Sequence, residues 1–524
     1  MATLQLGEYS SFQLSIAIIL LTLTIRVGLG FISSSPARSK KKPLPPGPWK
    51  LPFIGNIHQL ATSTLPHHRL RDLAQKHGPD LMHLQLGQLA HVVVSSPEAA
   101  REVMKTHDLT FASRPNLLVS DIVLYGRIGP YGEHWRQMRK VSAVELLSAK
   151  RVGSFRPIRE SEVAKLVAGI SCGGAAGAAV NVSRMLAATS SGVTFRAAFG
   201  MEKEVKEALF VKLVTDVTDA VAAFRVSDLY PSLKFLPSLT GYRAHLTRMH
   251  LAADEMLEEI IGEHRVKREG RKDLDDGGGY DQHQTEDLVD ILLNLQESGG
   301  LGYPITMNDI KGVIFEVFLA GTETSTRTVE WTLSEMIKNP RVMKKAQEEV
   351  RQMFSEGAVK EEGLHKLKYL DCVIQEGLRL HPPLPLLLPR ECREREEICG
   401  YEIPKKTKVL INAWAIGRDS RYWTEPDKFY PERFMDSSLD YKGTKFEFIP
   451  FGAGRRICPG ISFGVALVKI MLANLIYHFD WKLPGDAKPE NLDMTEQFSA
   501  SVRRKHNLSL IPISYDAISH RKTN

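Results

Sequence analysis

Residues 451–460 read FGAGRRICPG, and this short loop decides how the rest of the chain is interpreted. It places one cysteine, Cys458, in a turn that is rich in glycine and arginine. Three uses of such a cysteine are open at the outset: half of a disulfide, a ligand of zinc, or a thiolate held for a cofactor.

The other cysteines bear on that choice. The chain has five cysteines in 524 residues, an odd and sparse set without repeated spacing, which is not a disulfide framework. Cys392 and Cys399 are too far apart to form the C-x-x-C pair that is typical of zinc sites. We therefore expect the four cysteines other than Cys458 to be ordinary reduced thiols.

Composition limits the kind of partner. Hydrophobic residues make up 43% of the chain, enough for a large core, and 68 Lys and Arg against 61 Asp and Glu give a net charge of +7. This mild and diffuse excess suits a membrane surface or an acidic protein partner. It does not indicate nucleic acid.

The N-terminus indicates a membrane location. Residues 1–32 contain an apolar stretch about long enough to span a bilayer, interrupted only by Arg26. The basic cluster SSSPARSKKK (33–42) follows and marks the cytosolic side. A cleaved signal peptide is the alternative, but no small-residue cleavage site precedes the basic cluster. We expect a single-pass anchor in residues 1–32 and a cytosolic body.

The body is expected to be one domain. Residues 33–56 combine the basic cluster with the proline-rich PLPPGPWKLPFIGN (43–56), a stiff, non-helical hinge. From residue 57 to 524 helical periodicity dominates, with strands expected at 91–96 and 408–416 and surface loops at 171–180 and 267–287. The fold class is mainly α with small β-sheets.

The longest helical pattern covers residues 305–339. Thr306 and Asp309 form a possible capping box, and the Asn-Pro pair at 339–340 ends the pattern. Its middle, AGTETST, puts Gly321 and several hydroxyl groups where larger apolar residues pack best, which predicts a local distortion. A buried acid, Glu323, beside Thr324 is a candidate for proton delivery, whereas a plain surface helix is the alternative.

Two further motifs contain charged residues that are placed to bind a carboxylate. Glu376 and Arg379 lie three residues apart on one helix, and Arg433 in FYPERF (429–434) is a second arginine that can bind the same carboxylate. This cluster has a structural role rather than a catalytic one. In YGEHWRQMRK (131–140), Trp135 and Arg139 lie one turn apart and form a candidate clamp for a carboxylate, although an ordinary amphipathic helix has the same pattern.

Taken in order, the proline hinge, the W-R-x-x-R helix, A-G-T-E-T, E-x-x-R, P-E-R-F and F-G-A-G-R-R-I-C-P-G resemble the cytochrome P450 superfamily of haem-thiolate monooxygenases. The hinge, FASRP, PERF and the cysteine loop resemble its plant endoplasmic-reticulum branch, and the resemblance runs from residue 43 onward. It implies a long central helix over the haem and the cysteine loop beneath it.

The resemblance also implies a role for each motif residue. Cys458 is expected to be the axial thiolate of haem b iron, with Phe451 shielding the sulfur, while Thr324 and Glu323 relay protons to bound dioxygen. The residues expected to hold the haem propionates are Trp135, Arg139, Arg390 and Arg456. Substrate contacts are expected from 111–125, 317–320, 385–388 and 498–501.

The expected activity is oxidation of a small apolar plant metabolite, with a terpenoid favoured and an alkaloid or phenolic as alternatives. Electrons are expected from NADPH through cytochrome P450 reductase, with cytochrome b5 as a second possible donor. The surface expected to bind the reductase carries Arg136, Lys140, Lys445 and Arg455. A reductase-independent isomerase or dehydratase and a haem sensor or carrier are the rival functions; the Glu323–Thr324 pair argues against the isomerase.

Overall fold

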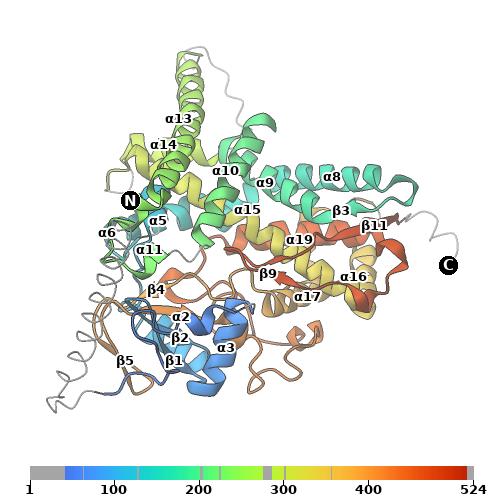
Figure 1. Cartoon of the computed structure of the whole chain (residues 1–524). Helices are drawn as coiled ribbons and strands as arrows, with labels where there is room; N and C mark the ends of the chain where they lie inside the picture. Colours follow the sequence, from blue (N-terminus) through green and yellow to red (C-terminus); the bar gives the residue numbers. More distant parts are fainter. Residues whose placement is uncertain are drawn as a thin grey trace, which may run out of the picture.

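A computed structural model describes residues 42–515, apart from 63, 127–128, 201–203, 223–225, 275–285, 300–302 and 356. The expected anchor at 1–32 and residues 33–41 of the basic cluster lie outside the described residues. Figure 1 shows a large helical part beside a smaller part in which β1, β2, α2 and α3 lie together. The fold class is therefore mainly α with small β-sheets, as the sequence predicts.

The helices and strands have the following bounds. The helices are α2 (Ile57–Leu60), α3 (Pro66–His77), α4 (Pro97–Arg101), α5 (Leu118–Ile122), α6 (Glu133–Lys140), α7 (Ala149–Ser154), α8 (Arg156–Gly173), α9 (Val182–Phe199), α10 (Glu204–Ala222), α11 (Val226–Leu229), α12 (Leu236–Leu239), α13 (Tyr242–Leu274), α14 (Leu288–Ser298), α15 (Met307–Lys338), α16 (Pro340–Met353), α17 (Lys368–Leu380), α18 (Ala413–Ile416) and α19 (Ile461–His478). The strands are β1 (Leu81–Leu86), β2 (Leu89–Val94), β3 (Val180–Asn181), β4 (Arg390–Glu391), β5 (Glu396–Ile398), β6 (Tyr401–Ile403), β7 (Lys408–Ile411), β8 (Phe479–Lys482), β9 (Glu496–Gln497), β10 (Arg503–Arg504) and β11 (Ser509–Ser514).

The largest sheet has the strand order β1-β2-β7-β4, with β2 and β7 parallel. The strand predicted at 91–96 is confirmed as β2, whose last three valines are buried. The strand predicted at 408–416 is only half right, because β7 ends at Ile411 and α18 follows. The side chain of Asn412 accepts a hydrogen bond of 3.0 Å from the backbone N–H of Ala415, which caps this short helix.

The proline-rich segment lies against this sheet. The backbone N–H of His83 in β1 donates a 2.8 Å hydrogen bond to the carbonyl of Pro46. A Cβ on Gly47 would stand 2.1 Å from the carbonyl oxygen of His83, so only glycine fits at this close approach. The segment is non-helical until Ile57, as predicted, and its position is fixed by the domain.

The central helix α15 contains 32 residues, long enough to run about 48 Å through the helical part, between α9, α17 and α19 (Figure 1). The capping box of Thr306 and Asp309 is present, as predicted. The predicted distortion near Gly321 does not occur: the residues form α-helix without interruption. The hydroxyl of Ser190 in α9 donates a 2.8 Å bond to the carbonyl of Thr322, so the polar residues here join two helices.

Two predicted loops need correction. Residues 267–274 continue α13, because this stretch of Lys, Arg, Glu and Asp consists mainly of good helix formers. Residues 171–173 likewise belong to α8, and the chain turns only from Gly174 onward. Among the described residues, one helix is long and apolar enough to cross a membrane, α19, but 67% of it is buried, which identifies it as a core helix.

Candidate active site

The cysteine loop joins the sheet-containing part to α19. The N–H of Cys458 donates a 3.0 Å hydrogen bond to the carbonyl of Phe451, which closes the loop. Gly452 and Gly454 adopt φ values of 71° and 70°, a region that glycine tolerates at little cost. A Cβ on Gly454 would stand 2.0 Å from the carbonyl oxygen of Met104. The glycines therefore let the loop turn tightly and approach a neighbouring backbone.

The thiol of Cys458 lies just before the first turn of α19. Burial raises its pKa, while the backbone hydrogen bond from Gly460 and the nearby charge of Arg139 oppose that rise. N–H groups at the start of a helix and a guanidinium both favour the anionic sulfur. The surroundings are therefore prepared for a thiolate, but a cation bound to the sulfur is needed to overcome the cost of burial.

Arg456, in the same loop, bonds the backbone of two other segments. Its guanidinium donates hydrogen bonds of 2.6 Å and 3.0 Å to the carbonyls of Ala112 and Gly129. Its central carbon lies 4.0 Å from the centre of the Trp135 ring, a cation–π contact. Trp135 thus positions Arg456, a contact that the sequence did not predict.

Arg139 and Arg390 approach the loop from the two sides. Arg139 on α6 donates a hydrogen bond to the carbonyl of Ile457, next to the cysteine. Arg390 on β4 donates a 2.9 Å bond to the carbonyl of Ala453 and lies 3.3 Å from a carboxylate oxygen of Asp108. All the arginines that the sequence assigns to this site are therefore brought to the cysteine loop.

A fourth guanidinium was not predicted. Arg114, the arginine of FASRP, donates hydrogen bonds to the carbonyls of Leu388 and Pro389. Burial, together with the charges of Arg390 and Arg456, lowers its pKa well below the usual range. Arg114 was quoted only as part of a family motif, and a lone arginine before proline carries no spacing signal of its own.

In the described part of the chain, the four guanidiniums carry more positive charge than the carboxylates that act on them can balance. Burial lowers the pKa of Arg390 and Arg456, to about 10 for Arg456, and each of these groups disfavours another through like charge. The carboxylates of Asp108 and Glu316 oppose this repulsion. Buried charges are normally paired, so this arrangement calls for an anionic ligand with more than one carboxylate.

On α15, the residues at 316, 320 and 324 share one face because they are spaced by four. Glu316 and Ala320 are exposed although the helix is otherwise buried around them, and the charge of Glu316 acts on Cys458, Arg139 and Arg456. This face is therefore directed toward the cysteine loop. Glu316 was missed in the sequence because it lies outside the AGTET motif.

The proposed proton-delivery pair is arranged differently from the expectation. The hydroxyl of Thr324 donates a 2.7 Å bond to the carbonyl of Ala320. Glu323 forms an ion pair of 3.2 Å with Arg327, so its carboxylate is directed along the helix. Gly321, expected to leave a gap for the ligand, faces Thr194 and Phe463 and allows α9 and α19 to pack closely.

The charge cluster comes together in the core. Arg379 binds both oxygens of Glu376 at 2.7 and 2.8 Å, and Arg433 binds the same carboxylate at 3.0 Å. Arg379 also donates 2.6 Å bonds to the carbonyls of Gly417 and Pro426. The cluster ties α17 to two later loops, consistent with a structural role.

The segments expected to contact substrate are linked to one another. Arg114 bonds the 111–125 segment to the backbone at 388–389, and a Cβ on Gly452 would lie 3.8 Å from the side chain of Leu387. The N–H of Val502 donates to the carbonyl of Pro383, and Trp331 of α15 donates to the carbonyl of Val502. The segments 111–125 and 385–388 therefore lie beside the cysteine loop, and the chain directly after 498–501 is held against Pro383 and α15.

Comparison with known proteins identifies the family to which this chain belongs. The cytochrome P450 family profile matches residues 45–510, and the chain belongs to this family. Desmethyl-deoxy-podophyllotoxin synthase of Sinopodophyllum hexandrum is 50% identical over 96% of this chain and 97% of that protein. Premnaspirodiene oxygenase of Hyoscyamus muticus is 49% identical over 91% and 94%, and salviol synthase of Salvia pomifera is 47% identical over 92% and 94%. A zebra fish cytochrome P450 structure with abiraterone has the same fold, with a TM-score of 0.71 and 22% identity over 86% of this chain and 99% of that one.

The protein is therefore a cytochrome P450 monooxygenase, and its relatives support a place in plant specialised metabolism. The family's cofactor is haem with thiolate-ligated iron, reduced by electrons that derive from NADPH through a reductase. The side chains present fit this group, because the half-buried thiol of Cys458 stands beside four guanidiniums that outnumber the carboxylates acting on them in the described part of the chain.

Proposed function

We propose that this enzyme is anchored in the endoplasmic-reticulum membrane and hydroxylates a small apolar plant metabolite of the terpenoid class. The observation that carries the proposal is the juxtaposition of the cysteine loop with the Glu316–Thr324 face of α15. Glu316 of this face acts through its charge on Cys458, Arg139 and Arg456. Next to the face, Gly321 and Ser325 pack against Phe463 and Gly464, just after Cys458, with contacts of 3.9 and 3.7 Å for an added Cβ.

In this proposal each residue at the loop has one task. Cys458 provides the thiolate, Phe451 covers it, and the guanidiniums and the Trp135 ring orient and neutralise the haem propionates. Haem, when bound, supplies the oxidising chemistry that inserts one oxygen atom of dioxygen into a C–H bond. The residues assigned to the propionates are Trp135, Arg139, Arg390 and Arg456, with Arg114 added from the structure.

Thr324 is proposed to hold and pass a proton at its hydroxyl. The hydroxyl of Thr324 donates its hydrogen bond to the carbonyl of Ala320, and the hydroxyl oxygen can still accept a hydrogen bond from water. Proton delivery from Glu323 then requires its carboxylate to turn away from Arg327. The retention of this acid and hydroxyl favours a monooxygenase over the isomerase or dehydratase alternative.

An apolar substrate is supported by the side chains around the site. Leu117, Leu118, Ile122, Val317 and Leu387 are apolar and keep some accessible surface. The terpenoid class is favoured by relatives named for premnaspirodiene and salviol. A phenolic substrate of the lignan type is the second candidate, because another relative is named for desmethyl-deoxy-podophyllotoxin.

A membrane location is supported by an exposed apolar surface made by two segments. Trp49 and Phe53 of the proline-rich segment are 66% and 63% exposed, and Phe235 and Leu239 are 62% and 76% exposed. The hydroxyl of Tyr230 donates to the carbonyl of Phe53 at 3.3 Å, so the two segments lie side by side. Large exposed aromatic and aliphatic groups next to an expected anchor favour contact with lipid.

Reduction by an acidic reductase is supported by basic groups close to the cysteine loop. Arg455 belongs to the loop, and Arg136 and Lys140 extend from α6, which Arg139 ties to Ile457. Lys445 is also exposed. We propose this surface as the docking site for cytochrome P450 reductase, with cytochrome b5 as a possible second partner.

The proposal is tested in microsomes that contain this protein and the reductase. NADPH is supplied with a panel of terpenes, lignans and alkaloids, and products are identified by mass spectrometry. We expect an oxygenated terpene whose formation requires NADPH and dioxygen and disappears with Cys458→Ala. Product without NADPH would support the isomerase, and turnover of lignans alone would support the second candidate. Retention of the thiolate-type absorption of the reduced carbonyl complex in Cys458→Ala would refute the ligand assignment.

A further inference from the structure

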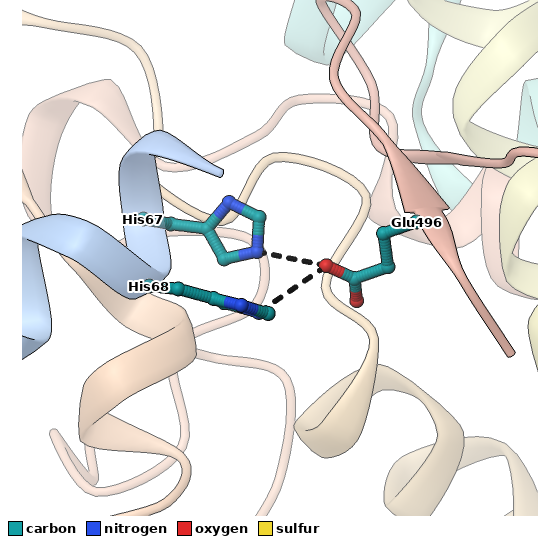
Figure 2. Close-up of side chains that lie close together, drawn as sticks. All are labelled: His67, His68 and Glu496. Carbon is teal, nitrogen blue, oxygen red and sulfur yellow. Dashed lines mark hydrogen bonds and ion pairs between the residues drawn. The ribbon is translucent and has the colours of Figure 1, made fainter. Parts of the chain in front are cut away.

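Three histidines from distant parts of the chain surround one carboxylate, away from the cysteine loop. His67 and His68 belong to α3, His381 directly follows α17, and Glu496 begins β9. Figure 2 shows the first two rings converging on the same oxygen of Glu496, at 3.0 and 3.3 Å. His381 lies on the other side, with its Nδ1 3.6 Å from the second oxygen.

The nitrogens around this carboxylate are poorly satisfied by protein groups. Nε2 of His68 and Nδ1 of His381 are buried without a hydrogen-bond partner among the described residues. The His381 side chain is 9% exposed and that of Glu496 is 10% exposed. Both nitrogens lie within ion-pair distance of Glu496, and a ligand bound between the histidines and the carboxylate would give the nitrogens a partner of good geometry.

A second carboxylate fixes the orientation of His381. Its Nε2 lies 2.8 Å from a carboxylate oxygen of Glu335, and because a carboxylate only accepts, Nε2 carries the proton. The ring is also stacked on Trp331, with centroids 4.4 Å apart and planes 2° apart. Nδ1 is thus directed at Glu496 from a separation too long for a hydrogen bond. Glu335 and Trp331 therefore hold the His381 ring beside Glu496.

We propose that His67, His68 and Glu496 form a binding site for a divalent cation of the zinc class, with His381 held beside them. Zinc bonds of 2.0–2.1 Å in a tetrahedron place neighbouring ligand atoms about 3.4 Å apart. Nε2 of His67 and Nε2 of His68 lie 3.0 and 3.3 Å from the same oxygen of Glu496, close to this value, and the ligand atoms of the three residues all lie within 4.8 Å of one another. Imidazole nitrogens with one carboxylate suit zinc, whereas magnesium and calcium prefer oxygen alone.

The local charges are compatible with a cation. Glu496 and Glu335 supply two negative charges. Arg418 is one opposing cation, and it is engaged elsewhere: it lies 3.2 Å from Asp427 and 4.2 Å from the centre of the Trp414 ring. Lys338 and Arg504 also act on Glu335, whereas the oxygens of Glu496 are contacted by the three histidines, so a bound ion would find its negative charge chiefly at Glu496.

A second cluster of similar residue types serves as a comparison. His264, Asp287 and Asp290 also lie close together. There, both nitrogens of His264 are bonded, to Ile260 at 2.8 Å and Asp287 at 2.9 Å, and Asp287 caps the N–H of Asp290. This group is complete as a helix cap and needs no ion.

The proposed ion has a structural consequence. It joins α3 to the β9–β10 hairpin, which are separated by hundreds of residues in the chain. The hairpin includes residues 498–501, one of the segments assigned to the substrate. The ion would therefore fasten one wall of the site to the rest of the domain.

The test uses the full-length, haem-loaded protein equilibrated with zinc alone and then freed of unbound metal. The variants are Glu496→Gln, which keeps the shape, and His68→Ala, whose side chain is 30% exposed and tolerates truncation. His506→Ala is the control, because His506 is 67% exposed. The reduced carbonyl spectrum verifies the fold of each protein.

We expect about one zinc per haem in the wild type and in His506→Ala, and at least about a tenfold loss of zinc affinity in the other two variants. X-ray absorption at the zinc edge is expected to show imidazole ligands. Wild-type protein without retained zinc, or equal retention in Glu496→Gln and His68→Ala, would overturn the proposal. Because metal content is measured, the outcome does not depend on knowing the substrate.

Discussion

Arg379 holds Glu376 through two hydrogen bonds of 2.7 and 2.8 Å, and neither side chain has any exposed surface. Arg379→Lys keeps the positive charge, but a lysine ammonium cannot bond both carboxylate oxygens of Glu376 as the guanidinium does. Because it leaves a buried carboxylate and several carbonyls short of partners, we expect a loss of about 3–5 kcal/mol of stability, measured by denaturant unfolding of the haem-loaded protein. Arg341→Lys is the control, since Arg341 is 60% exposed in its pair with Glu432 and is expected to change stability by less than about 1 kcal/mol.

Gly377, next to Glu376 on α17, is required by helix packing. A Cβ there would stand 2.2 Å from the hydroxyl oxygen and 3.1 Å from the Cβ of Thr332 on α15. Gly377→Ala is therefore expected to destabilise the protein by about 1–3 kcal/mol in thermal or denaturant unfolding. Gly262→Ala on α13 meets no atom within 4 Å and is expected to stabilise by up to about 1 kcal/mol. Equal effects of the two substitutions would refute the packing argument.

Thr324 gives a prediction about coupling. Thr324→Ala removes the hydroxyl that we assign to proton transfer, so product formed per NADPH consumed is expected to fall about tenfold or more, with peroxide rising. Thr215→Ala is a matched control, since Thr215 bonds back to its own helix in the same way, at 2.9 Å from the carbonyl of Val211. Unchanged coupling in Thr324→Ala would remove this residue from the mechanism.

The four guanidiniums predict how firmly haem is held. Arg114→Gln removes a charge-assisted contact, which corresponds to about 10- to 100-fold weaker haem binding, measured as the rate of haem transfer to an acceptor protein. Arg136→Gln removes a guanidinium from a side chain that is 54% exposed, and haem transfer is expected to stay at the wild-type rate. A wild-type rate in Arg114→Gln would contradict the assignment.

The lowered pKa of Glu432 predicts that the stability of the fold decreases in acid. The hydrogen bond from Arg341 lowers its pKa from 4.5 to about 2, with further bonds from Lys345 and Tyr369. A lowered pKa stabilises the fold fully above pH 4.5, and this contribution is lost as the pH falls toward 2. Glu432→Gln is expected to remove about 1–2 kcal/mol of this pH-dependent stability, allowing for solvent screening, in unfolding measured across that window.

Glu362→Gln is the control for this experiment. Its side chain is 79% exposed in a pair with Arg156, so the slope of stability against pH is expected to stay as in the wild type. A wild-type slope in Glu432→Gln would show that other carboxylates carry the acid sensitivity.

Local sequence signals predicted much of the helical frame. The capping box at Thr306 and the Asn-Pro pair at 339–340 gave the ends of α15 almost to the residue, because both act through neighbouring backbone groups. Two of the errors have local causes as well. Polar residues at 267–274 were interpreted as a loop although most of them favour helix, and Asn412 starts a helix inside an apolar run.

The sequence predicted those residues of the site that belong to a motif. Cys458, Arg456 and Arg139 belong to recognisable patterns, and the structure brings them together. Arg114 and Glu316 are single charged residues without a spacing signal, so only the folded chain reveals that they face the cysteine loop. The Glu496 cluster was equally hidden, because its partner His67 lies 429 residues away in the sequence.

The four guanidiniums at the cysteine loop also affect how the enzyme is made. Their mutual repulsion opposes closure of the domain around the cysteine loop until negative charge arrives from elsewhere. The propionates of the cofactor are suited to supply that charge, so the final stage of folding and haem insertion become one event. Cellular haem supply would then set how much of the newly synthesised chain survives, and a shortage would send it to proteolysis instead of leaving a reserve of empty enzyme.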